Sequence, residues 1–171
     1  MRRRETEMID LVIGPVVEWL VKKGAEKIQS SAEFQHSRQA IREAVVREIR
    51  FNQALIAEVL DGKAEDSAAL AKCIAEEMDF SAFSKLEDSF VPIRLFFDGP
   101  CPAVGDKADA SYREWSSQLK SEAEWVERIY LRSRILRARW RSGQPQGEKS
   151  VRYVKWLMAQ WLKTLQPAAT S

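Results

Sequence analysis

The sequence predicts an all-α fold, an up-and-down bundle of four long helices with shorter helical pieces, and three observations support this. Apolar residues recur at steps of three and four over long segments. Strict alternation of apolar and polar residues, which would indicate strands, never extends beyond a few residues. Seven Gly and six Pro in 171 residues favour long helices over many tight turns. We expect a single helical-bundle domain over residues 1–171, with a frayed tail from about residue 166.

The first helix is expected over about residues 5–29. Asp10, Gly14, Glu18 and Lys22 fall at four-residue intervals and form one narrow stripe on an otherwise apolar cylinder. A helix of this kind is usually buried in protein or lies against a partner. The charged residues leave at most seven uncharged residues in a row in its apolar run, whereas a membrane span needs about 20. We therefore expect no membrane span and an N-terminal apolar helix at a protein interface.

The second and third helices are expected over about residues 30–60 and 65–78. The second has an apolar seam with steps of three and four after its first members, and the "DGK" sequence ends it. The stretch 79–98 keeps near-helical spacing of Phe, Leu and Ile residues, but Pro92 interrupts it. The seam of the second helix consists of Phe34, Ile41, Val45, Ile49, Asn52, Ile56 and Val59.

The last two long helices are expected over about residues 111–141 and 148–165. A loop precedes them, because Gly99, Pro100, Pro102 and Gly105 lie within seven residues. The "SGQPQG" sequence separates the two helices for the same reason. The fourth helix carries an apolar seam of Trp115, Leu119, Val126, Ile129, Leu136 and Trp140.

Asn52 is the exception in the apolar seam of the second helix. A buried amide without a partner costs roughly 1–3 kcal/mol, so the pattern predicts that Asn52 is hydrogen bonded. A single polar residue in such a seam is a known means of fixing helix packing. A ligand site would bring several convergent polar groups, and Glu48 is the obvious neighbour. We interpret Asn52 as a structural polar residue, and expect Asn52→Leu to fold at least as stably with looser packing specificity.

Several common catalytic sites lack a necessary residue. The one histidine, His36, is expected in water near the start of a helix, and neither common glycine-rich phosphate-binding motif occurs. Cys73 and Cys101 have no metal-ligand spacing and form no disulfide framework. We predict no catalytic residue, no metal site and no cofactor. The cysteine usage favours a reducing compartment, and we expect a cytoplasmic protein.

One acidic motif offers an enzymatic alternative. The "EAEWVE" sequence places Glu124 and Glu127 one helical turn apart, with Glu122 nearby, and a second acidic group lies earlier in the chain, at residues 76–79. In this fragment the chain resembles the all-α nucleotide pyrophosphohydrolases of the MazG type, which use E-x-x-E helices. The resemblance implies Mg²⁺ held by carboxylates together with substrate phosphates. Acidic pairs at this spacing are also common on solvated helix faces.

The charge of the chain is divided unevenly. Residues 128–171 contain ten Lys or Arg and one acid, Glu148, which gives +9, whereas residues 1–127 carry −7. Some of these cations are expected to stabilise helix C-termini or neutralise the acidic part. The others would form a recognition surface, because arginine suits bidentate contacts and aromatic residues lie among the charges. The predicted binding surface consists of Arg128, Arg132, Arg134, Arg137, Arg139, Arg141, Arg152, Lys155, Trp140 and Trp156.

These patterns predict a non-enzymatic function. We expect a helical accessory subunit that docks onto a larger protein assembly, with an assembly that handles nucleic acid as one option. The alternative is a protein that binds nucleic acid without sequence specificity through the basic surface of residues 128–155, since no sequence-reading motif accompanies it. A Mg²⁺-dependent pyrophosphohydrolase of the MazG-like type is the third reading.

Overall fold

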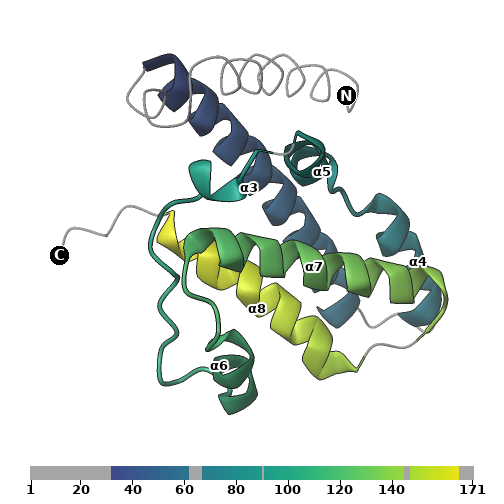
Figure 1. Ribbon diagram of the computed structural model, residues 1–171. Helices are drawn as coiled ribbons and strands as arrows, with labels where there is room; N and C mark the ends of the chain where they lie inside the picture. The colour runs from purple at the N-terminus through teal and green to yellow at the C-terminus, as the bar shows by residue number, and fades with distance from the viewer. Residues whose placement is uncertain (1–31, 62–66, 90, 145–146, 166–171) are drawn as a thin grey trace. The chain divides into compact units, whose positions relative to one another are not determined.

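The computed structural model describes residues 32–61, 67–89, 91–144 and 147–165, which fold into helices and contain no strand (Figure 1). The all-α prediction is therefore confirmed for this part of the chain, while the arrangement as a four-helix bundle stays a prediction. The expected helix at 5–29 and the tail from 166 lie outside the described residues. In chain order the elements are α3 (Ala32–Asp61), α4 (Ser67–Glu77), α5 (Ser81–Asp88), the 3-10 helix η1 (Ile93–Leu95), α6 (Ala110–Ser116), α7 (Glu122–Arg141) and α8 (Glu148–Thr164).

The described residues form two compact units, and each is treated by itself below. Unit 1 contains residues 32–48 of α3 together with 80–98, which hold α5 and η1. Unit 2 contains the rest of α3, from residue 49, together with α4, α6, α7 and α8. The single domain expected from the sequence stays a prediction. None of the helices in the described ranges is long and apolar enough to cross a membrane.

Unit 1 is held by aromatic residues from both of its segments. Phe34 of α3 and Phe96 after η1 are fully buried, and their ring centroids lie 6.2 Å apart. The backbone carbonyl of Phe96 accepts hydrogen bonds from Arg38 Nε at 3.3 Å and from Arg42 Nη1 at 2.8 Å. Pro92 precedes η1 as its N-cap, so the interruption expected at this proline separates α5 from η1.

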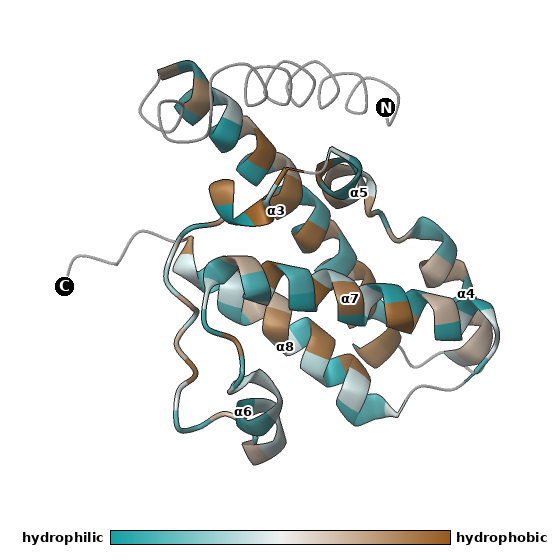
Figure 2. Cartoon of the chain, viewed as in Figure 1, coloured by the Kyte–Doolittle hydropathy of each residue, from teal (hydrophilic) through white to brown (hydrophobic). Residues whose placement is uncertain are grey.

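Unit 2 is built around α7 and α8, which pack against each other, and α4 packs on α7 (Figure 1). Both α7 and α8 carry hydrophobic and hydrophilic residues (Figure 2). Each helix has one side that is buried and one that faces solvent. The buried side of α7 carries Trp125, Val126, Ile129 and Leu136, each at most 1% exposed. Trp125 Nε1 donates to the Leu157 carbonyl of α8 at 3.0 Å, which satisfies the buried indole.

The long helix expected over 111–141 is wrong in one respect, because the chain leaves the helix between α6 and α7. Ser121 is the N-cap of α7, and its hydroxyl accepts a hydrogen bond from the Glu124 amide at 3.2 Å. The Glu124 carboxylate accepts in turn from the Lys120 amide at 2.7 Å. These two bonds resemble a capping box. The first amides of a helix have no acceptor within the helix, and the two side chains supply one for each of two backbone amides at the start of α7.

Candidate functional site

Asn52 is 1% exposed and bonds to the backbone of a single residue. Its Nδ2 donates to the Asp79 carbonyl at 2.5 Å, and its Oδ1 accepts from the Asp79 amide at 2.9 Å. The side-chain amide thus pairs with the chain just beyond α4 as a second peptide group would. Both backbone groups of Asp79 are satisfied by this contact, in the way that buried backbone groups require.

Glu48, one helical turn before Asn52, is also buried and binds backbone amides. Its carboxylate accepts from the Ala82 amide at 2.7 Å and from the Phe83 amide at 3.4 Å. These residues lie in the first turn of α5, and the N-cap residue Phe80 offers no side-chain acceptor. A carboxylate from another helix therefore caps α5, where the helix dipole favours negative charge.

The arginines of α7 divide into two stripes according to helical spacing. Positions separated by three, four or seven residues share a face of an α-helix. Arg134, Arg137 and Arg141 form one set, which we call the α4-side stripe. The second set, Arg128, Arg132 and Arg139, is the α8-side stripe.

The α4-side stripe meets acidic groups of the same unit. Arg141 Nη2 lies 2.6 Å from the Glu76 carboxylate of α4. Burial lowers the pKa of Arg137 most, and the nearby Arg141 lowers it further, whereas Glu76 and Asp79 raise it. The sequence left open whether the basic cluster meets internal acids, and for this stripe an internal acid is present.

The α8-side stripe is different, because no described acidic side chain forms an ion pair with any of its three arginines. The Arg132 guanidinium lies over the Tyr153 ring of α8, 5.9 Å from its centroid. Leu131, next to Arg132 in the sequence and one turn after Arg128, is 56% exposed. This stripe therefore carries positive charge that no described acid pairs with, and the exposed Leu131 lies between it and the α4-side stripe, three positions from both Arg128 and Arg134.

Aromatic residues of α6 and α8 form a group beside the α8-side stripe. Tyr153 and Trp156 are stacked with centroids 5.8 Å apart, and Tyr112 of α6 lies 5.3 Å from each. Trp115 meets Tyr153 edge-on at 5.0 Å and is 38% exposed. Lys149 lies 5.9 Å from the Trp115 ring centroid and donates to Ser111 Oγ at 2.7 Å. We call Tyr112, Trp115, Tyr153 and Trp156 the aromatic group.

The remaining predicted surface residues lie in three different settings. Arg152 pairs with Glu148 at 2.6 Å, one turn earlier on α8, and Lys155 pairs with Asp61 at 3.4 Å. These are exposed pairs of small energetic effect. Trp156 is half-buried in the aromatic group. Trp140 is 5% exposed, so it lies inside unit 2 and not on the recognition surface expected for it.

The carboxylates of the E-x-x-E fragment have structural contacts. Glu122 is buried, and its carboxylate accepts from the Gly99 amide at 2.8 Å and from Trp161 Nε1 at 3.0 Å. Glu124 caps α7 as described above. Within the ranges that the structure describes, no three or more His, Cys, Asp or Glu side chains are grouped to hold a metal ion. The magnesium-dependent reading stays a prediction.

Sequence reasoning missed three features of this region. Tyr112 and Trp115 join the basic end because α6 folds back on α8, which helical periodicity does not reveal. Leu131 does not belong to the apolar seam of its helix, and its exposure could have been predicted from that position. The "SEAE" sequence at 121–124 matches the capping-box pattern and could have marked the start of α7.

Comparison with known proteins gave no family for this chain. No family model matches the sequence, and neither a curated protein nor a solved structure matches it.

Proposed function

We propose that this chain is a non-enzymatic helical interaction subunit that docks onto a larger protein assembly through the α8-side stripe and Leu131. The single observation that carries the proposal is a stripe of three arginines that have no acidic partner among the described residues, with Leu131, 56% exposed, one turn after the first of them. Arginine is enriched in protein interfaces, where its guanidinium stacks and forms bidentate contacts with carboxylates. The complementary partner face would be acidic at its rim and apolar at its centre.

The structure offers a matched pair of variants to test this proposal. In one variant Arg128, Arg132 and Arg139 are replaced by Gln, and in the other Arg134, Arg137 and Arg141 are replaced by Gln. Both variants lose three charges from the same helix. Affinity purification from the native host, with nuclease-treated lysate and mass spectrometry, measures binding, and thermal melts measure stability.

The α8-side variant is expected to lose the co-purifying protein while its melting temperature stays within a few degrees of the wild type. The α4-side variant is expected to keep that protein and to be slightly less stable, by at most about 1 kcal/mol for the exposed Arg141–Glu76 pair that it loses. Leu131→Gln should weaken capture without a change of charge. Equal capture by both triple variants would contradict the assignment of the surface.

Non-specific binding of single-stranded nucleic acid is a second candidate, favoured by the aromatic group. Half-exposed Trp115 with Tyr112 and Trp156 presents ring surface close to arginine, and bases stack on such surfaces at about 1–3 kcal/mol each. Fluorescence anisotropy with a labelled oligothymidine measures this binding over a range of salt concentrations. The plot of the logarithm of the binding constant against the logarithm of salt concentration is expected to be less steep for the α8-side variant, with a slope smaller in magnitude by about two. Trp115→Ala should weaken binding at every salt concentration.

A further inference from the structure

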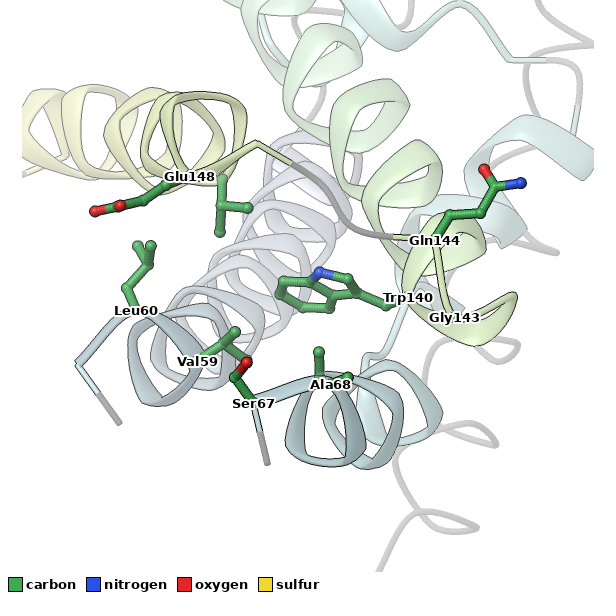
Figure 3. A pocket seen from close by; sticks show the side chains of 10 residues that line it. Val59, Leu60, Ser67, Ala68, Trp140, Gly143, Gln144 and Glu148 are labelled. Atoms are coloured by element: carbon green, nitrogen blue, oxygen red, sulfur yellow. The ribbon is translucent and has the colours of Figure 1, made fainter. Parts of the chain in front are cut away.

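A pocket of about 570 Å³, open to solvent on one side, lies in unit 2, where the ends of four helices meet, and we call it the cavity. α3 and α4 contribute five of the lining residues, and the other five come from α7, the residues just after it, and α8. The lining consists of Val59, Leu60, Ser67, Ala68, Ala71, Trp140, Gly143, Gln144, Glu148 and Val151. Figure 3 shows the indole of Trp140 in the middle of these side chains. The volume falls within the range of about 300–1,000 Å³ that is typical of small-molecule sites.

Small residues on α4 and at the end of α7 leave this space open. Ala68 and Ala71 line it from α4, where a larger aliphatic residue would fill it. Gly143 lies at the end of α7 with φ of +69°, a conformation that favours glycine, and its amide donates to the Trp140 carbonyl at 3.1 Å. The chain therefore turns away at this point, and the turn leaves one side of the Trp140 indole facing the cavity.

The indole N–H of Trp140 has no hydrogen-bond partner among the described residues, and although the residue is only 5% exposed, its nitrogen is not among the fully buried atoms that lack a partner. An indole N–H that is accessible in this way can donate to water or to an acceptor on a molecule that enters the space. The polar groups at the rim do not supply one. Figure 3 shows the Glu148 carboxylate and the Gln144 carboxamide pointing away from the indole, and Glu148 pairs with Arg152.

We propose that this cavity binds a small, neutral, mostly apolar molecule that carries a carbonyl acceptor for Trp140 Nε1. The apolar part would lie against Val59, Leu60 and Val151. Removal of this apolar surface from water makes the free energy of binding more favourable. The ligand is neutral because the lining contains no Lys or Arg to balance an anion, and its one acid already has a cationic partner. This site is separate from the α8-side stripe, so the two proposals stand or fall independently.

The test uses the full chain and prodan, a neutral naphthalene that carries a ketone. Prodan emission shifts to shorter wavelength and gains intensity in an apolar site, so titration gives an affinity and a stoichiometry. We expect one molecule per chain. Trp140→Phe keeps an aromatic ring and removes the N–H, and it should weaken binding by about three- to tenfold.

A matched pair on α4 locates the binding. Ala68→Trp fills the cavity from an exposed position and is expected to weaken prodan binding at least about tenfold, whereas Ala69→Trp, on the same helix but outside the lining, should not. Thermal melts report whether each variant is folded. If Ala68→Trp does not fold, the effect of Trp140→Phe on prodan binding tests the proposal. Absence of binding to the wild type, or equal binding to wild type, Ala68→Trp and Trp140→Phe, would overturn the proposal.

Discussion

Asn52 gives the clearest prediction for a single residue. Asn52→Leu removes the acceptor and the donor that serve the Asp79 amide and carbonyl, so both backbone groups lose a partner. Each unsatisfied buried group costs about 1–3 kcal/mol. The geometry thus reverses the expectation of equal or greater stability drawn from the sequence, and we now predict a loss of about 2–4 kcal/mol in the free energy of unfolding, measured by urea denaturation. Ala54→Leu, exposed on the same helix, serves as the control and should change stability little.

Tyr153 gives a second prediction, because its hydroxyl is buried without a hydrogen-bond partner among the described residues. Removing that hydroxyl in Tyr153→Phe keeps the ring in the aromatic group. We expect the variant to be as stable as the wild type, or up to about 1 kcal/mol more stable. Urea denaturation at neutral pH measures this difference. A loss of more than 1 kcal/mol would mean that the hydroxyl is satisfied in solution.

The same residue predicts a dependence of stability on pH. Burial raises the pKa of Tyr153, while the neighbouring Arg128 and Arg132 lower it in part. The phenol therefore stays protonated in the folded chain to a higher pH than in the unfolded chain. Unfolding releases a proton once the pH exceeds about 10, the ordinary tyrosine value, so the wild type loses stability there as pH rises. Tyr153→Phe should show a shallower loss over the same range.

At the scale of elements, α5 depends on a residue that it does not contain. The Glu48 carboxylate accepts hydrogen bonds from backbone amides in the first turn of α5. Removal of a capping acceptor typically lowers the free energy of unfolding by about 0.5–2 kcal/mol. We predict that Glu48→Ala costs about 2 kcal/mol, at the upper end because the cap is buried and charged. Glu48→Gln keeps an acceptor and should cost less. Glu58→Ala, at an exposed position of α3, is the control, and an equal effect of the two alanine variants would refute the capping role.

The break between α6 and α7 shows how one helix terminus can redirect a segment. The capping contacts of Ser121 and Glu124 start α7 afresh, and α6 is thereby free to bring Tyr112 and Trp115 onto α8. A continuous helix over 111–141 would place these two rings along its own axis. The aromatic group therefore exists because the helix is interrupted.

For the whole molecule, the continuity of α3 leads to a prediction about cooperativity. α3 is one helix from Ala32 to Asp61, and it supplies fully buried residues to both units, among them Val45 in unit 1 and Ile56 in unit 2. We expect calorimetric unfolding in a single transition with equal calorimetric and van't Hoff enthalpies. Val45→Ala and Ile56→Val should each lower the same melting temperature, by about 2–4 °C per kcal/mol. Two transitions, each sensitive to one variant, would show that the units unfold separately.

The sequence by itself determined the all-α class and most helix bounds. Helical periodicity and Gly or Pro at segment ends are local signals, and they placed α3 and α8 within two residues of their observed ends where these are described. The need of Asn52 for a partner could also be read locally, since an amide in an apolar seam must be paired. Its partner, the backbone of Asp79, could not, because 27 positions separate the two residues.

Tertiary structure alone decided which of the clustered cations pair with an acid of the described part of the chain and which do not. Helical spacing sorts the arginines of α7 into two stripes, but it does not say which flank faces Glu76 and which faces Tyr153. The packing of α4 on one flank and α8 on the other makes that distinction. It also turns Trp140 from an expected surface residue into the wall of a cavity. Contacts between segments far apart in the chain carry this information, and local sequence patterns do not contain it.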